Sequence, residues 1–240
     1  MFRNLFFAAL AAALCAGLLV SAIQHFRVTP LILHAETFEG EAGHSHGAGA
    51  DAHDHEAEVE AGEWAPQDGA ERTAYTVLAN LLAAAGFALL IGGVSALANL
   101  PIDTRTGWVW GAAGFAAFVL APAYGLAPEL PGMPAADLFA RQLWWIGTAL
   151  ATGAAILLLA RTRAPWAVAV AVALVAIPHI VGAPAAPDEP SAVPAHLAAE
   201  FAAAAIGTSA VFWLVLGTVF GGVNTYLAAR PAASVNGVKA

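Results

Sequence analysis

Charged residues are scarce in this sequence. Asp, Glu, Lys and Arg make up 11% of the 240 residues, whereas a soluble domain carries about 25%. Hydrophobic residues make up 60%, and the mean hydropathy is +0.71. This composition excludes an ordinary soluble domain and indicates an integral membrane protein.

Further absences narrow the class of protein. Cys15 is the single cysteine, which excludes a disulfide framework within the chain and leaves a packing role. No Gly-x-x-x-x-Gly-Lys-Ser/Thr sequence occurs, so ATP hydrolysis by a P-loop is excluded. No charged residue falls in the middle of an apolar run, which argues against simple proton-coupled antiport. The polar groups that remain inside the runs are Asn80, Thr148, Thr152, Thr208, Ser209 and Asn224.

Long apolar runs are abundant. A transmembrane helix needs about 20 mostly apolar residues, and six runs meet or approach this length. We therefore predict an all-α integral membrane protein, with one polytopic domain over residues 1–240 that forms a bundle of six transmembrane helices. The expected spans are Leu5–Ile23, Thr76–Leu100, Gly107–Tyr124, Leu143–Ala160, Pro165–Val181 and Phe201–Leu227.

The first run has a second interpretation. Arg3 followed by an apolar stretch, with Val20-Ser21-Ala22 as a small-residue cleavage site, resembles a secretory signal. The 19 uncharged residues from Leu5 to Ile23 exceed the roughly 7 to 15 of a signal core. We expect a retained helix, whereas cleavage would leave five spans.

The distribution of basic residues predicts the orientation, because short cytoplasmic loops carry the excess of Lys and Arg. We expect a multi-pass protein of the bacterial inner membrane with both termini in the cytoplasm. The loop between the first two spans is then periplasmic. The net charge of −8 lies almost wholly on that outer side and would attract cations and repel nucleic acid. The inner side holds Arg3, Arg105, Arg161, Arg163, Arg230 and Lys239, and the outer side holds Arg27, Arg72 and Arg141.

The outer loop contains a tract rich in histidine and acid. Residues 39–68 have low hydrophobicity, repeated Gly and dense acid, which predicts a disordered segment. Neutral imidazole binds transition metals, and nearby carboxylates can complete the shell. The alternative is a spacer that only keeps the loop solvated. The candidate capture ligands are His44, His46, His53, His55, Asp51, Asp54 and Glu56.

Four further residues are candidates for a metal entrance on the same side. His34 and Glu36 follow the first span, and Glu129 lies in a proline-rich outer turn, where it could ligate a cation or close the turn onto a backbone amide. His179 follows Pro178 near a span end, and a histidine at membrane depth usually has a partner or a function. The alternative for His179 is an interfacial histidine bonded to a carbonyl. For His25 and His196 we favour an ordinary interfacial role.

Several separate motifs carry a family resemblance. The N-terminal "MFRNLFFAALAAALCAGLLVSAIQHFRVTPLILHAE", the turn "APELPG", "RQLWW", "PHIVGAP" and "VPAHLAAEFAAAAI" together resemble the CbtA family of cobalt transporter subunits. The resemblance implies a polytopic inner-membrane protein linked to cobalamin synthesis, described with five spans where we count six. It also implies a small single-span, His-bearing partner, CbtB. Glu36, Glu129 and His179 lie inside the matching motifs.

Three classes of function remain. The leading hypothesis is a non-enzymatic subunit that transports a divalent metal, with Co²⁺ as its cargo and no tightly bound cofactor. Ni²⁺ or Zn²⁺ is a variant that residue chemistry leaves open. A partner subunit or an oligomer would complete the path through the lipid bilayer. The alternatives are a membrane-bound metal-binding or sensing module, and a membrane enzyme or haem subunit, which would need paired histidines on facing helices.

Overall fold

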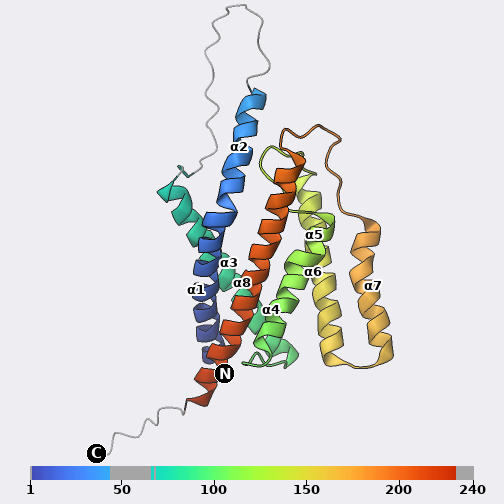
Figure 1. The fold of residues 1–240 in the computed structure, drawn as a ribbon. Coiled ribbons are helices and arrows are strands. Elements are labelled where there is room, and N and C mark those ends of the chain that lie inside the picture. Colours follow the sequence, from blue (N-terminus) through green and yellow to red (C-terminus); the bar gives the residue numbers. More distant parts are fainter. Residues whose placement is uncertain (1, 44–65, 68, 231–240) are drawn as a thin grey trace, which may run out of the picture.

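The computed structural model describes residues 2–43, 66–67 and 69–230. Within these ranges the chain is helical and contains no strand (Figure 1). The elements are α1 (Phe2–Arg27), α2 (Thr29–Gly43), α3 (Ala70–Ala98), α4 (Gly107–Phe115), the π-helix η1 (Ala116–Leu120), α5 (Ala121–Gly125), α6 (Leu138–Arg161), α7 (Pro165–Val181) and α8 (Ala195–Ala229).

All six predicted spans are helical. Five helices are long and apolar enough to cross a membrane: α1, α3, the continuous α4–η1–α5 segment, α6 and α8. The sixth, α7, is apolar but has 17 residues, which corresponds to about 25 Å and is short of the roughly 30 Å of hydrocarbon. The all-α membrane class is confirmed, with five candidate spans where we predicted six.

Helices α1, α3, the α4–η1–α5 segment, α6, α7 and α8 alternate in direction (Figure 1). The start of α1 and the end of α8 lie at one end of the bundle, which we call the terminal end. The other end, which we call the loop end, carries α2, the α5–α6 connection and the α7–α8 connection. This arrangement is the one expected for six passes.

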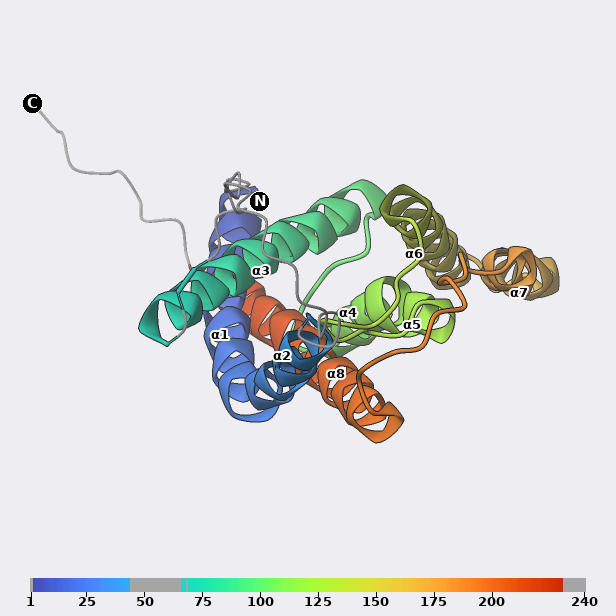
Figure 2. The ribbon, with the colours of Figure 1, turned by 90° about the horizontal axis from the view of Figure 1, so that it is seen from above.

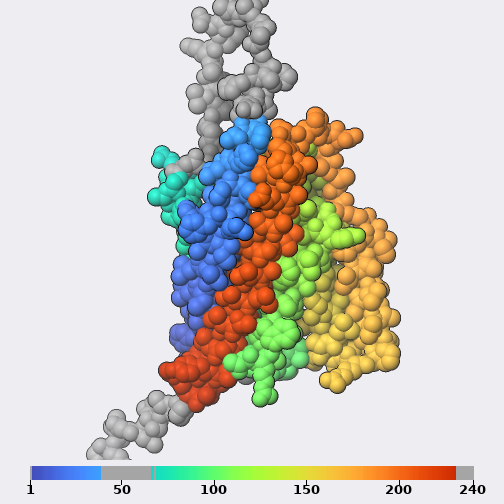
Figure 3. Space-filling model, in the orientation of Figure 1, coloured from blue at the N-terminus to red at the C-terminus, as the bar shows by residue number. Residues whose placement is uncertain are grey.

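Helices α1, α3, α4 and α8 form the core of the bundle, and α1 packs against both α3 and α8 (Figures 2 and 3). The buried face of α1 consists of alanines, which let the neighbouring backbones approach closely. Helix α1 therefore supplies part of the central core. These alanines are Ala8, Ala9, Ala12, Ala13 and Ala16.

Glycines bring α4 and α8 into contact. A Cβ on Gly217 would lie 2.2 Å from the carbonyl oxygen of Gly107, and one on Gly111 would lie 2.3 Å from the carbonyl oxygen of Trp213. A Cβ on Gly221 would lie 2.1 Å from the carbonyl oxygen of Asp103. The pattern Gly107-x-x-x-Gly111 on α4 therefore packs against Gly217-x-x-x-Gly221 on α8, as small residues do between transmembrane helices.

An aromatic cluster fills the middle of this core. Trp213 is 1% exposed, and its ring stacks on Phe118 with centroids 5.5 Å apart and planes 7° apart. Phe87 lies against the same indole at 4.8 Å. Gly114 leaves the space for the indole, because a Cβ there would lie 2.1 Å from its ring. Aromatic rings, rather than charges, therefore occupy the centre.

Two of the inner polar groups bond to other segments of the bundle. Asn80 on α3 donates to Ser21 and Gln24 on α1, at 3.0 and 2.6 Å. Asn224 on α8 donates to the carbonyl of Ile102 at 2.8 Å. Interhelical bonds of this kind contribute about 0.6 to 2 kcal/mol each in a membrane. We therefore assign Asn80 and Asn224 to helix packing.

The segment after the first span differs from the prediction. Residues 29–43 form α2 instead of loop, so the first five residues of the expected disordered segment, 39–43, are helical. Pro30 lies in the first turn of α2. Backbone N–H groups in a first turn make no hydrogen bond within the helix, so proline is tolerated there. An apolar cluster packs α2 against α8 and the α5–α6 connection. The sequence pattern alone did not indicate this packing. Its buried residues are Val28, Ala35, Leu130, Val193, Leu197 and Phe201.

Candidate metal entrance at the loop end

Charges are sorted between the two ends of the bundle. Among the described residues, five arginines lie at the terminal end and three lie at the loop end. One described acid, Asp103, lies at the terminal end, and nine lie at the loop end. The loop end is thus the anionic face that the sequence predicts. Its described acids with described side chains are Glu36, Glu71, Glu129, Asp137, Asp188, Glu189 and Glu200.

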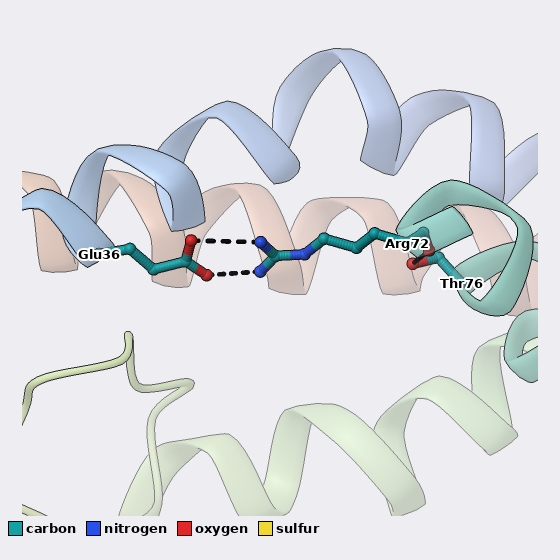
Figure 4. Close-up of polar contacts among 3 residues, drawn as sticks. All are labelled: Glu36, Arg72 and Thr76. Atoms are coloured by element: carbon teal, nitrogen blue, oxygen red, sulfur yellow. Dashed lines mark hydrogen bonds and ion pairs between the residues drawn. The ribbon is translucent and has the colours of Figure 1, made fainter. Parts of the chain in front are cut away.

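Glu36 projects from α2 toward Arg72 at the start of α3 (Figure 4). The guanidinium donates two parallel hydrogen bonds to the carboxylate, Nη1 to Oε2 at 3.2 Å and Nη2 to Oε1 at 2.5 Å. The Arg72 and Glu36 side chains are 30% and 32% exposed, respectively. Glu36 is therefore an accessible carboxylate that already has an arginine partner.

Glu129 has the same kind of partner. Its carboxylate lies 2.8 Å from Nη2 of Arg141 in the first turn of α6. This contact is neither of the two roles expected for Glu129, because the partner is an arginine rather than a metal or a backbone amide. The ion pair joins the proline-rich connection to α6, whose N-terminus is capped by Asp137 through a bond from the Ala140 N–H at 2.9 Å.

His179 lies in an aromatic corner where α5, α6 and α7 meet. The edge of its imidazole contacts Tyr124 at 5.2 Å and Trp144 at 5.8 Å between centroids. We considered a hydrogen bond from His179 to a carbonyl. A bond of this kind in this corner is made instead by Trp144, whose indole donates to the Pro178 carbonyl at 3.1 Å. His179 is half-buried. Its imidazole is therefore partly accessible from outside the chain.

His34 does not join Glu36 in a shared site. Both lie on α2, and residues two apart on a helix do not face each other. Glu36 faces Arg72, whereas His34 is exposed and its ring lies 5.4 Å from that of Phe38. At the start of α8, His196 and Glu200 share a helix face, as their spacing suggested, and both are exposed.

The described residues do not include a preassembled metal site. No group of three or more His, Cys, Asp or Glu side chains within the described ranges could hold an ion. The seven capture candidates, His44 to Glu56, lie outside the described residues. Sequence reasoning missed Arg72 and Arg141 as the partners of Glu36 and Glu129. The sequence does show that two of the three loop-end arginines follow segments that contain acids. Which acid each arginine pairs with is determined by the fold.

The fold and the charge distribution define an all-α, polytopic membrane protein with one anionic end. A family profile described as "Probable cobalt transporter subunit (CbtA)" matches residues 2–224, nearly the whole chain. The chain belongs to this family, so the resemblance seen in its motifs is confirmed. Comparisons with curated proteins and with solved structures found no match. The family description supports cobalt transport by a subunit, which implies a partner and a role other than catalysis.

Proposed function

We propose that this protein is the membrane-spanning subunit that carries Co²⁺ across the inner membrane into the cytoplasm, where cobalamin synthesis uses it. The observation that carries the proposal is the family match over residues 2–224. The fold agrees with it, because five helices are long enough and apolar enough to span a bilayer.

The loop end faces the periplasm in this proposal. The excess of arginine at the terminal end supports this orientation by the positive-inside rule. Reporter enzymes fused at the two ends of the chain should be active in the same compartment. Reporters active in different compartments would contradict both the six passes and the orientation.

The tract from His44 to Glu56 captures the ion, and Glu36 receives it. α2 ends at Gly43, directly before the tract, and Glu36 lies two helical turns below that end. Glu36 is accessible, and carboxylate oxygen is a suitable ligand for a divalent cation. Because Arg72 holds the same two oxygens, the cation and the guanidinium compete for them. This competition lets Glu36 release the ion as well as bind it.

A second protein completes the path. The core of this chain is closed by Phe118, Phe87 and Trp213, and no charged side chain of the described residues is buried in it. An ion that crosses needs polar ligands along the way. We propose that a small single-span, His-bearing subunit of the CbtB type supplies them at an interface with this chain.

Uptake of radiolabelled cobalt tests the proposal. Proteoliposomes that contain this protein, with and without the small subunit, would be challenged with excess nickel or zinc. We expect uptake that depends on this chain and resists excess zinc. Metal binding to the outer tract without uptake in either preparation would contradict transport and favour a receptor. Equal competition by nickel would change the assigned cargo.

A further inference from the structure

A groove opens between the α4–η1–α5 segment and α6, beneath the Glu129–Arg141 ion pair. Its volume is about 520 Å³, within the 300 to 1,000 Å³ typical of small-molecule sites. The helices that form it lie side by side in both views (Figures 1 and 2). Its apolar wall includes Phe118, Pro122, Leu126, Leu138, Trp145 and Ile146.

The groove has few polar lining residues. Glu129, Arg141 and Gln142 are the charged or amide side chains among its lining residues, and the first two are 2.8 Å apart. The rest of the lining is carbon-rich. The groove therefore has an amphiphilic shape, with one positive and one negative group above an apolar channel.

The depth of the groove follows from Trp145, which lines it. Trp145 lies one turn along α6 from Arg141, and tryptophan prefers the level of the lipid headgroups. The ion pair is then at the headgroup level of the loop-end leaflet, one turn of α6 beyond Trp145.

We propose that this groove binds one phospholipid with a zwitterionic ethanolamine headgroup. The phosphate pairs with the Arg141 guanidinium, for which arginine has a suitable donor geometry. The primary ammonium donates to the Glu129 carboxylate, and an acyl chain fills the channel. The Glu129–Arg141 pair matches both charges of such a headgroup, whereas a purely anionic headgroup satisfies only Arg141. This site is independent of the proposed metal path through Glu36.

Native mass spectrometry of the delipidated full-length protein in detergent tests this site. The probes are phosphatidylethanolamine and phosphatidylglycerol with identical acyl chains, which share the phosphate and differ in the ammonium. We expect one tightly bound lipid per chain, with phosphatidylethanolamine preferred about fivefold, the effect of one exposed charge contact. Glu129→Gln should abolish the preference, and Arg141→Gln should weaken both lipids. Glu200→Gln, on an exposed loop-end carboxylate, is the matched control.

A second pair of variants keeps the ion pair intact. Ala123 lines the groove, whereas Leu120 lies nearby on the same segment, is 52% exposed and does not line it. Ala123→Phe should reduce lipid binding about tenfold or more because the ring would occupy the channel, while Leu120→Phe should leave binding unchanged. Equal affinity for the two lipids in the wild type, or full binding by Ala123→Phe, would overturn the proposal. A groove covered by a second copy of the chain would also overturn it and would be detected as a lipid-free dimer.

Discussion

The carboxylate of Glu36 on α2 and the guanidinium of Arg72 on α3 form a two-bonded ion pair at the base of the histidine tract. It joins the helices on either side of the segment 44–65, which lies outside the described residues. Both side chains are about one-third exposed, so the pair contributes on the order of 1 kcal/mol or less to stability. Variants of Glu36 can therefore report on metal handling without disrupting the fold.

Glu36→Gln should lower cobalt uptake strongly. The substitution keeps the shape of the side chain but removes the charge that a divalent ion requires, and we expect a loss of at least about tenfold, since even outer-shell changes at metal sites cost 10 to 100-fold. The thermal midpoint in detergent should change little. Glu71→Gln, on the exposed carboxylate one residue before Arg72, is the control. Wild-type uptake by Glu36→Gln would remove Glu36 from the path.

Deleting Gly43 to Glu60 should affect uptake only when cobalt is scarce. The deletion removes all seven capture candidates and leaves α1, α3 and the rest of the bundle. The cobalt concentration for half-maximal uptake should rise, with an unchanged maximal rate. In the wild type, capture should also weaken below about pH 6.5, where imidazole takes up protons. A deletion variant that fails to insert, or that loses its maximal rate, would contradict a capture role.

Gly221→Ala should destabilise the bundle, and Gly222→Ala should not. A Cβ on Gly221 would lie 2.1 Å from the Asp103 carbonyl oxygen and 3.1 Å from the Gly107 Cα, whereas one on Gly222 meets nothing within 4 Å. Overpacking of this kind costs about 1 to 3 kcal/mol, while alanine at Gly222 gains helix propensity of about 1 kcal/mol. The measurement is the thermal midpoint of each variant and of the wild type in the same detergent. Equal midpoints would mean that α4 and α8 are not in the described contact.

The sequence predicts the spans well because an apolar run of sufficient length is a local property. It does not predict α2, because the apolar cluster that buries Ala35 together with Leu130 and Leu197 forms only in the fold. The ion pairs are non-local in the same way. Glu36 and Arg72 are 36 residues apart, and only the antiparallel arrangement of α1–α2 and α3 brings them together. The sequence identified the carboxylates, but the fold determines whether each faces a cation, an arginine or water.

His179→Ala should lower uptake even when cobalt is abundant, if His179 acts in the path. Its imidazole packs against Tyr124 and Trp144, so a structural role would instead lower the thermal midpoint. His179→Phe would retain much of the ring contact without a metal ligand and separates the two roles. His196→Ala, at an exposed position on α8, is the control. Normal uptake by His179→Phe would assign His179 to packing.

Asp103 connects stability to pH at the terminal end. Its Oδ1 accepts the backbone N–H groups of Thr106 at 2.9 Å and Arg105 at 2.8 Å, and these two bonds are the main reason that its pKa lies below the ordinary value of 3.8. They favour the charged form of the carboxyl in the folded state. A depressed folded pKa stabilises the protein above the unfolded pKa, and this stability is lost as pH falls through the folded pKa.

Asp103→Asn should therefore destabilise the protein at neutral pH and matter less in acid. The neutral amide keeps an acceptor oxygen but loses the charge that strengthens the two backbone bonds. The turn also matters for packing, because the Asp103 carbonyl lies against Gly221 and the N–H of Thr104 donates to Thr225 at 3.1 Å. Thermal midpoints of wild type and variant, measured from pH 7 downward, should converge as pH falls below 3.8 and through the lower folded pKa. A difference in midpoint that stays constant with pH would show that the charge of Asp103 is not what holds this turn.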